Sequence, residues 1–202
     1  MHKLTAVAWM ADFATRIDAA ADELTELDRL IGDADHGSNM QRGMAAVTAL
    51  DPDGLPDAAS YLKKAAMTLV STVGGASGPL YGSLLMRFAG TIGDGEETAT
   101  SMAVAWRAAL DAVQLRGKAI VEDKTMVDAL SPAVEAMEAP GQTLAQCLSA
   151  ATAAAVAGRD HTTALVARKG RASYLGARSA GVADPGATSL VLLLQSAERT
   201  FC

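Results

Sequence analysis

The segment between Leu27 and Gly43 concentrates the residue types that bind metal ions. Its sequence, LDRLIGDADHGSNMQRG, carries Asp28, Asp33 and Asp35, with glycines that let the backbone turn between them. Carboxylates held close together repel one another unless a cation neutralises them. Mg²⁺ binds a few carboxylates and completes its coordination with water and substrate phosphates. The spacing favours a divalent-metal site directed at phosphate. The alternative is surface charge at Asp28 and helix capping by the other two aspartates.

The residues that follow the acidic run, His36, Gly37, Ser38 and Asn39, are expected to open a helix near Ser38. Backbone N–H groups and the helix dipole at such a start attract anions, which again favours phosphate. The alternative for His36 is a hydrogen-bonded capping role.

A glycine-rich stretch, GGASG at residues 74–78, connects two predicted helices. A phosphate group or an adenine ring can approach a backbone of this kind closely. The stretch matches neither the GxxxxGK(S/T) phosphate-binding motif nor the GxGxxG dinucleotide motif. By itself it is more typical of a plain connection than of a binding site.

A polar loop with a basic cluster is predicted over residues 168–186, RKGRASYLGARSAGVADPG. The cluster comprises Arg168, Lys169, Arg171 and Arg178, in a chain whose net charge is −6. Phosphate is the natural counterpart of such a cluster, and a solvated loop is the alternative. Long loops inside a compact domain are usually functional or disordered.

The elements that must position these residues are helices. Apolar residues recur at helical spacing and no alternating strand pattern is visible. Asp184 and Pro185 suit the start of the last helix, and Gly117 suits the position just after another. Helices are predicted over roughly 4–30, 38–49, 57–73, 79–89, 102–116, 125–137 (interrupted or kinked at Pro132), 144–158, 161–167 and 184–199. We expect one all-α domain over residues 1–202, an antiparallel up-and-down bundle or barrel of about eight helices.

Composition disfavours several classes of function. No Lys/Arg run of nucleic-acid type is present, and no segment resembles a signal peptide or a membrane span. Cys147 and Cys202 have no metal-binding spacing, so a reduced, cytoplasmic protein is expected. The three histidines are scattered and offer no Ser–His–Asp or Cys–His pair.

Four segments, in this order, resemble the L subunits of dihydroxyacetone kinases, which are the nucleotide-binding components of those enzymes. Together they extend from residue 27 to residue 189, which is most of the chain. The segments are LDRLIGDADHGSNMQRG, MTLVSTVGGASGPLYG, RGKAIVEDKTMVDALSPAVE and ARKGRASYLGARSAGVADPGATS.

The resemblance implies an eight-helix antiparallel barrel with ADP or ATP bound at one end. It implies that Asp28, Asp33 and Asp35 hold two Mg²⁺ ions that bridge the nucleotide phosphates, and that these residues and Arg171 are catalytic. The positions that it implies for nucleotide contacts are His36, Gly37, Ser38, Asn39, Ala76, Ser77, Gly117, Met126, Arg171, Asp184, Pro185 and Gly186.

The resemblance also implies an activity and partners. The family transfers the γ-phosphoryl group to dihydroxyacetone, an alcohol-group kinase reaction. In one branch, a separate K subunit holds the substrate. There, an M subunit of the phosphoenolpyruvate-dependent phosphotransferase system recharges the bound ADP. The other branch is fused to its substrate domain and uses free ATP. The GDADHG sequence resembles the first branch.

Two alternative functions stay open from the sequence: a free-ATP kinase subunit for a related short ketose, and a nucleotide-sensing module without transfer activity. Whether the chain forms a homodimer also stays open. One local departure is visible. Family members usually have Pro-Gly where this chain has Val121 and Glu122, beside the expected nucleotide contact Met126.

Overall fold

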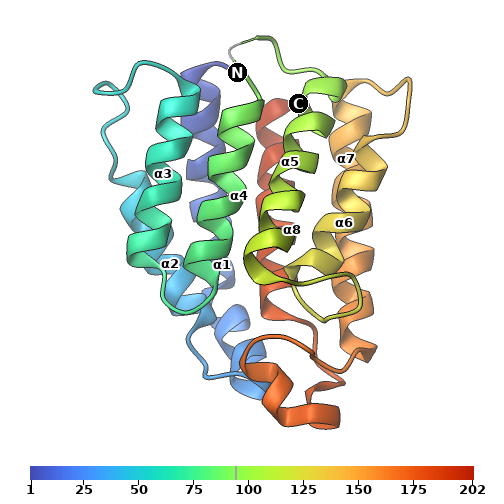
Figure 1. The fold of residues 1–202 in the computed structure, drawn as a ribbon. Coiled ribbons are helices and arrows are strands. Elements are labelled where there is room, and N and C mark those ends of the chain that lie inside the picture. The colour runs from blue at the N-terminus through green and yellow to red at the C-terminus, as the bar shows by residue number, and fades with distance from the viewer. Residues whose placement is uncertain (94) are drawn as a thin grey trace.

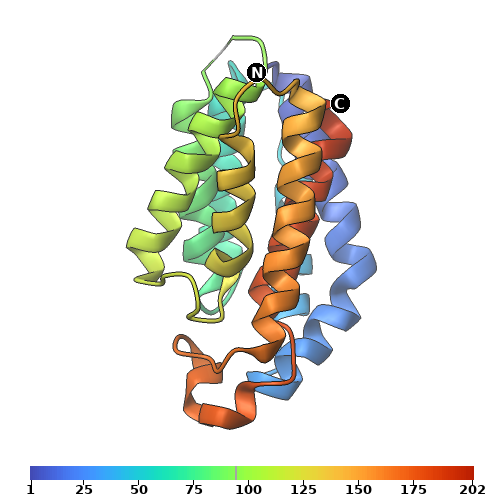
Figure 2. The same ribbon diagram turned by 90° about the vertical axis from the view of Figure 1, so that its right-hand side faces the viewer.

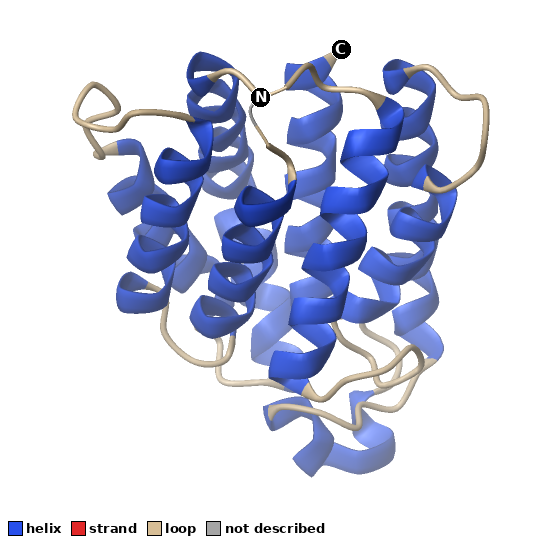
Figure 3. Cartoon of the chain, turned by 45° about the horizontal axis from the view of Figure 1, so that its top comes forward, coloured by secondary structure: helices blue, strands red, loops and turns tan. Residues whose placement is uncertain are grey.

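The computed structural model describes residues 1–93 and 95–202, and this part of the chain is helical with no strand. Figure 3 shows it as helices joined by loops. This confirms the predicted all-α class. The α-helices of the described residues are α1 (Lys3–Ile31), α2 (His36–Thr48), α3 (Ala58–Thr72), α4 (Ser77–Thr91), α5 (Ala99–Gly117), α6 (Met126–Met137), α7 (Leu144–His161) and α8 (Pro185–Phe201), and the 3₁₀ helices are η1 (Thr162–Ala164) and η2 (Arg171–Ser179).

The α-helices form a closed up-and-down ring, as predicted. Each helix packs against the next one in the sequence, and α8 packs against α1. The connections therefore alternate between two ends of the bundle (Figures 1 and 2). One end carries the long segment 165–184 between η1 and α8, which we call the strap, and we call this end the strap end. The opposite end, where both chain termini lie, is the far end.

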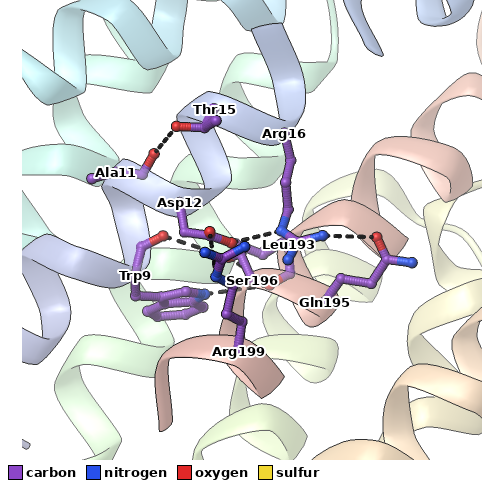
Figure 4. A network of polar contacts seen from close by, with 9 residues as sticks. All are labelled: Trp9, Ala11, Asp12, Thr15, Arg16, Leu193, Gln195, Ser196 and Arg199. Atoms are coloured by element: carbon purple, nitrogen blue, oxygen red, sulfur yellow. Dashed lines mark hydrogen bonds and ion pairs between the residues drawn. The ribbon is translucent and has the colours of Figure 1, made fainter. Parts of the chain in front are cut away.

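The ring closes where α1 meets α8 (Figure 4). Trp9 Nε1 donates a hydrogen bond to the Leu193 carbonyl oxygen at 3.3 Å. The Ser196 hydroxyl donates to the Trp9 carbonyl at 3.5 Å. An ion pair of 3.4 Å joins Arg199 to Asp12. These contacts link residues that are far apart in sequence, so the first and last helices hold each other in place.

Aromatic side chains fill the core towards the far end. The ring centroid of Trp9 lies 5.1 Å from that of Phe88 and 5.5 Å from that of Phe201. Trp106 completes the cluster, 5.3 Å from Phe88. Large rings in tilted and edge-to-face contact bury much apolar surface. The few aromatic residues of the chain thus serve mainly to pack the bundle.

Several helix boundaries differ from the prediction, and those of the second and seventh helices bear on the site and the packing. The second helix begins at His36 rather than near Ser38. The seventh continues through Gly158 to His161, so the predicted end at Gly158 is wrong. A Cβ atom at Gly158 would lie 2.2 Å from the carbonyl oxygen of Asp128. This glycine allows close approach of α6 and α7 and does not end the helix.

Other differences concern the strap end. Gly117 is the last residue of α5, and Lys118 takes the left-handed capping conformation with φ 49°. The helix predicted over 161–167 is reduced to the single turn η1, and the predicted loop contains η2. Helix α6 is not interrupted at Pro132.

Candidate nucleotide and metal site

The three aspartates of the acidic segment converge at the end of α1. Asp28, Asp33 and Asp35 each offer a carboxylate oxygen, and these oxygens all lie within 4.8 Å of one another. Asp28 Oδ2 accepts hydrogen bonds from the backbone N–H groups of Asp35 at 2.8 Å and His36 at 3.2 Å. Asp28 therefore shapes the turn as well as contributing charge. Asp35 occupies the N-cap position of α2 but makes no side-chain cap hydrogen bond, which leaves its carboxylate free.

Tight backbone geometry brings these aspartates together. A Cβ atom at Gly32 would lie 2.1 Å from Asp28 Oδ1, so only glycine leaves room for that carboxylate. Ala34 has φ 64°, a left-handed conformation that costs an alanine free energy. Ala34 lies between Asp33 and Asp35, so this strained turn directs both carboxylates to one point.

A cavity of about 510 Å³ opens beside the acidic turn. Its walls come from all four connections at the strap end, so residues far apart in sequence share it. The lining residues that the sequence analysis singled out are Asp28, Asp33, Asp35, His36, Ala76, Ser77, Gly117, Met126, Arg171, Asp184, Pro185 and Gly186. These residues therefore lie around one cavity, as the binding site that the resemblance implies requires.

Three predicted nucleotide contacts lie outside this lining. A Cβ atom at Gly37 would lie 2.0 Å from the Ala21 carbonyl oxygen, so this glycine serves the packing of α2 on α1. The Ser38 hydroxyl donates to the Asp35 carbonyl at 3.0 Å. Asn39 is buried beside Gly74 and accepts a hydrogen bond from Arg42.

A chain of polar side chains extends from the cavity wall into the bundle. The two ring nitrogens of His36 lie 3.1 Å from the Ser77 hydroxyl and 2.9 Å from the Ser189 hydroxyl. The Tyr81 hydroxyl lies 2.7 Å from that of Ser189. Burial lowers the pKa of His36, although the nearby Asp28 and Asp35 carboxylates act in the opposite direction. A neutral imidazole can donate from one nitrogen and accept at the other, so it joins α2, α4 and α8 without bringing a charge to the cavity.

Opposite the acidic turn lies the strap. Arg171 Nε is 3.1 Å from Asp33 Oδ2, although 71% of the arginine side chain is exposed. Lys169 Nζ lies 3.8 Å from Asp123 Oδ2, and both Lys169 and Arg171 line the cavity. The other two members of the predicted basic cluster, Arg168 and Arg178, are outside the lining. The strap therefore presents two cations to the cavity, one of them already at the aspartates.

Asp184 closes the cavity at the start of α8. Its carboxylate accepts a hydrogen bond from the Ala187 backbone N–H at 2.7 Å, which is the predicted N-cap role. Burial raises the pKa of Asp184 to about 7, the neighbouring Asp128 adds to this rise, and the Lys124 ammonium opposes it. This carboxyl therefore changes charge near neutral pH.

Several lining residues escaped the sequence reasoning. Lys124 and Thr125 lie in the loop before α6, and Leu80 and Val113 form an apolar wall with Met126. Gly75, by contrast, belongs to the glycine-rich stretch already noted in the sequence, and it has φ 64° with nothing within 4 Å of the position of a Cβ atom. A lysine in a loop gives no sequence signal for burial, and apolar lining residues look like core. Only the ring topology brings them together.

The donor set suits Mg²⁺. Asp28, Asp33 and Asp35 supply oxygen ligands only, without the sulfur or imidazole ligands that zinc prefers. Arg171 already neutralises part of their charge, which is what a bound cation would also do.

No helix of the described residues is long and apolar enough to span a bilayer.

Comparison with known proteins places the chain in a family. The DAK2 domain family model matches residues 30–199. The chain belongs to the DAK2 domain family, which confirms the predicted resemblance.

Relatives with established names match along most of the chain. It is 41% identical over 194 residues to the ADP-binding subunit DhaL of the PEP-dependent dihydroxyacetone kinase of Escherichia coli (strain K12), covering 94% of this chain and 92% of that protein. It is 38% identical over 199 residues to the corresponding subunit of kinase 1 from Listeria innocua, covering 96% and 95%. Human triokinase/FMN cyclase is 35% identical over 184 residues, which are 87% of this chain and 31% of that protein.

A solved structure shares the fold. The dihydroxyacetone kinase of C. freundii in complex with AMP-PNP and Mg²⁺ superposes with a TM-score of 0.73 at 22% identity, covering 98% of this chain and 34% of that one. At this identity, the match supports the arrangement of the helices and no more.

Proposed function

We propose that this chain is the nucleotide-binding subunit of a phosphoenolpyruvate-dependent dihydroxyacetone kinase. The observation that carries the proposal is the convergence of Asp28, Asp33 and Asp35 beside a cavity walled by a basic strap. The names and full-length coverage of the bacterial relatives support it. The subunit would act in the cytoplasm as one domain over residues 1–202. A separate K subunit would present dihydroxyacetone, and a phosphocarrier M subunit would recharge ADP.

The aspartates would hold two Mg²⁺ ions, which offset the negative charge of the nucleotide phosphates as the phosphoryl group moves. Asp28 suits this role because two backbone N–H groups fix its carboxylate. Asp33 and Asp35 suit it because the strained Ala34 turn orients both towards the same point. A fixed site loses little conformational entropy when ions bind.

The rest of the cavity offers a place for each part of a nucleotide. Leu80, Val113 and Met126 form an apolar surface that suits an adenine ring, and Gly117 lies beside them. The backbone at Ala76 and Ser77 begins α4, so its N–H groups suit phosphate oxygens. His36 and Asp184 to Gly186 face the same space from α2 and α8.

Arg171 would assist the transfer step. Phosphoryl transfer requires in-line positioning and neutralisation of charge on the moving group. An arginine can donate several hydrogen bonds to phosphate oxygens and keeps its charge at any physiological pH. The exposed side chain of Arg171 already reaches the aspartates, so it lies where that charge develops.

The test is Asp33→Asn, which removes one charge and keeps the shape of the side chain. Combined with K and M subunits, phosphoenolpyruvate and dihydroxyacetone, the variant should lose at least about 100-fold in turnover. Its thermal unfolding should barely change, since Asp33 is partly exposed. Asp22→Asn, at an exposed aspartate on α1, is the matched control and should turn over normally. Near-normal transfer by Asp33→Asn would refute the assignment.

Native mass spectrometry of the purified protein separates the branches of the family. Retained ADP with two Mg²⁺ ions supports a standing coenzyme recharged by the M subunit. Protein that binds ATP only on addition and transfers phosphate to a short ketose supports the free-ATP alternative. Binding without transfer to any ketose supports a nucleotide-sensing module.

A further inference from the structure

Lys124 is a buried cation that no sequence motif or comparison assigns. Only 2% of it is exposed, in the loop between α5 and α6. Its Nζ atom donates hydrogen bonds to three backbone carbonyl oxygens: that of Thr162 at 2.7 Å, that of Leu165 at 3.1 Å and that of Val182 at 2.6 Å. An ammonium group has three donors, so each finds an acceptor.

The three carbonyls belong to the two ends of one segment. Thr162 and Leu165 lie where the chain leaves α7, and Val182 lies just before it enters α8. The Lys124 side chain therefore links the two places where the strap joins the bundle, which we call the base of the strap. Other contacts reinforce the base: the Ala167 N–H donates to the Ser179 hydroxyl at 2.8 Å, and the Gly181 N–H donates to the Thr163 carbonyl at 2.7 Å.

The loop that carries Lys124 makes two further contacts with the strap, at residues 168 and 169. The Arg168 backbone N–H donates to the Asp123 carbonyl at 3.0 Å, and Lys169 pairs with the Asp123 carboxylate. Beyond these anchors the tip of the strap projects from the bundle (Figure 2). Gly170 and Gly176 have φ 62° and 55°, so glycines mark both sides of the tip segment that carries Arg171.

Burying an ammonium is costly unless its hydrogen bonds are complete. Burial lowers the pKa of Lys124, and the carboxylates of Asp184 and Asp128 oppose this change. A hydrophobic side chain would fill the same space without a desolvation cost. Here the ammonium donates three hydrogen bonds, to carbonyl oxygens at both ends of the strap, and these contacts offset the cost of burial.

We propose that Lys124 is a positioning residue, which fixes the base of the strap so that Arg171 lies over the three aspartates. The inference rests on the proposed function for what Arg171 does there. Lys124 acts through the strap, because its ammonium contacts the strap carbonyls. The contact that it maintains indirectly is the 3.1 Å ion pair between Arg171 and Asp33. Loss of the ammonium frees the strap and removes Arg171 from the site.

The first test needs no nucleotide. Amide hydrogen exchange over residues 165–184 should be at least about tenfold faster in Lys124→Met than in the parent protein, with the helices unchanged. Lys124→Gln, which keeps two N–H donors, should fall between them, and Lys124→Arg should restore slow exchange. Lys3→Met is the matched control, since Lys3 Nζ donates to one loop carbonyl, that of Leu55 at 2.9 Å, at the far end. Unchanged strap exchange in Lys124→Met and Lys124→Gln would overturn the proposal.

The second test is a double-mutant cycle on the dissociation constant for Mg²⁺–ADP. Lys124→Met and Arg171→Ala should each weaken binding about tenfold. If Lys124 acts through Arg171, adding Lys124→Met to Arg171→Ala should change the constant less than about twofold. Fully additive effects of the two substitutions on the binding free energy would contradict the proposal. Lys124→Gln takes the place of Lys124→Met in the cycle if the latter variant unfolds. A parent protein that binds no nucleotide would refute the proposed function, while the exchange experiment would still decide the role of Lys124 in the strap.

Discussion

The two ends of the helical ring differ in how they use acidic side chains and in where the backbone is strained. At the far end, three of the helices begin with ordinary side-chain caps: Asp57 caps α3, and Thr98 and Thr143 form capping boxes at α5 and α7. These caps satisfy backbone N–H groups that would otherwise lack partners. At the strap end, α6 and α8 are also capped, by Thr125 and Asp184, but Asp28 holds a turn and Asp35 makes no cap hydrogen bond with its side chain.

Backbone strain follows the same division. The non-glycine residues of the described chain with positive φ are Ala34, Lys118, Glu122 and Lys124, and all lie at the strap end. The left-handed positions in the far-end connections are glycines, Gly93 and Gly141. Strain of this kind persists where the surrounding structure enforces it, most often at functional sites. The packing and caps of the far end stabilise the fold, and the strap end tolerates strained residues that position charged groups.

The largest effect is expected from Gly32→Ala at the strap end. The new methyl group would force the Asp28 carboxylate from its place, because the two would be only 2.1 Å apart. Affinity for Mg²⁺–ADP, measured by isothermal titration calorimetry, should fall more than about tenfold. Gly90→Ala is the control, since nothing lies within 4 Å of that position. It should instead stabilise α4 by about 0.5–1 kcal/mol and leave binding intact. Equal binding by both variants would contradict the division between the ends.

Asp184→Asn tests the half-buried carboxyl at the start of α8 by the pH dependence of stability. Burial raises the folded-state pKa of Asp184 to about 7, above its value in the unfolded chain. The folded state therefore binds the proton more tightly, and this stabilisation is present at low pH and lost as pH rises through about 7. Asparagine keeps an acceptor for the helix cap and does not titrate.

The stability of Asp184→Asn relative to the parent should accordingly rise by roughly 2 kcal/mol between pH 5 and pH 8. Thermal unfolding of the metal-free protein at both pH values measures the change. A difference between variant and parent that is independent of pH would show that the carboxyl titrates normally.

Thr143→Ala removes a far-end cap. Its side chain accepts a hydrogen bond from the Gln146 backbone N–H at 3.3 Å, and Gln146 bonds back to the Thr143 N–H at 3.0 Å. The free energy of unfolding should fall by about 1 kcal/mol in urea denaturation. Nucleotide affinity should be unchanged. A change in affinity would mean that the two ends are coupled.

Lys118→Gly should give the smallest effect, and of opposite sign. Lys118 holds a left-handed conformation at the end of α5, which glycine adopts without steric cost. We expect stabilisation of about 0.5 kcal/mol, after the greater entropy of glycine in the unfolded chain is counted. Urea denaturation measures it. A loss of stability would indicate that the lysine side chain contributes more than its backbone costs.

The fold was predictable because its signals are local. Each helix of the ring carries a 3.6-residue apolar pattern, and short connections require antiparallel neighbours. The error at Gly158 has a physical cause: glycine as a helix end and glycine as a contact between helices look the same in sequence. The prediction of a helix over 161–167 was wrong because the chain leaves the helical conformation after η1 and enters the base of the strap.

The site was predictable only in part. The aspartates could be found because three carboxylates in a glycine-rich turn have few other uses. The partners of His36 could not, since Ser77 and Ser189 are distant in sequence and common in type. Lys124 could not, because burial of a loop lysine depends on carbonyls supplied by the strap.

The departure at Val121 and Glu122 was visible in sequence, and its structural meaning was not. Glu122 has φ 75°, a conformation suited to glycine. Its side chain accepts a hydrogen bond from His161 at 2.7 Å. The substitution therefore adds strain to the loop before α6 and at the same time ties that loop to the end of α7.

The closing contact between α1 and α8 has a consequence for protein synthesis. The cavity takes Asp184 and Pro185 from the last segment of the chain, and His36 reaches Ser189 there. A nascent chain on the ribosome can form the earlier helices, but it has no complete cavity until α8 emerges and docks. Because a ligand stabilises only the states that bind it, nucleotide cannot protect any shorter intermediate from proteolysis. Nucleotide binding thus reports that the ring has closed.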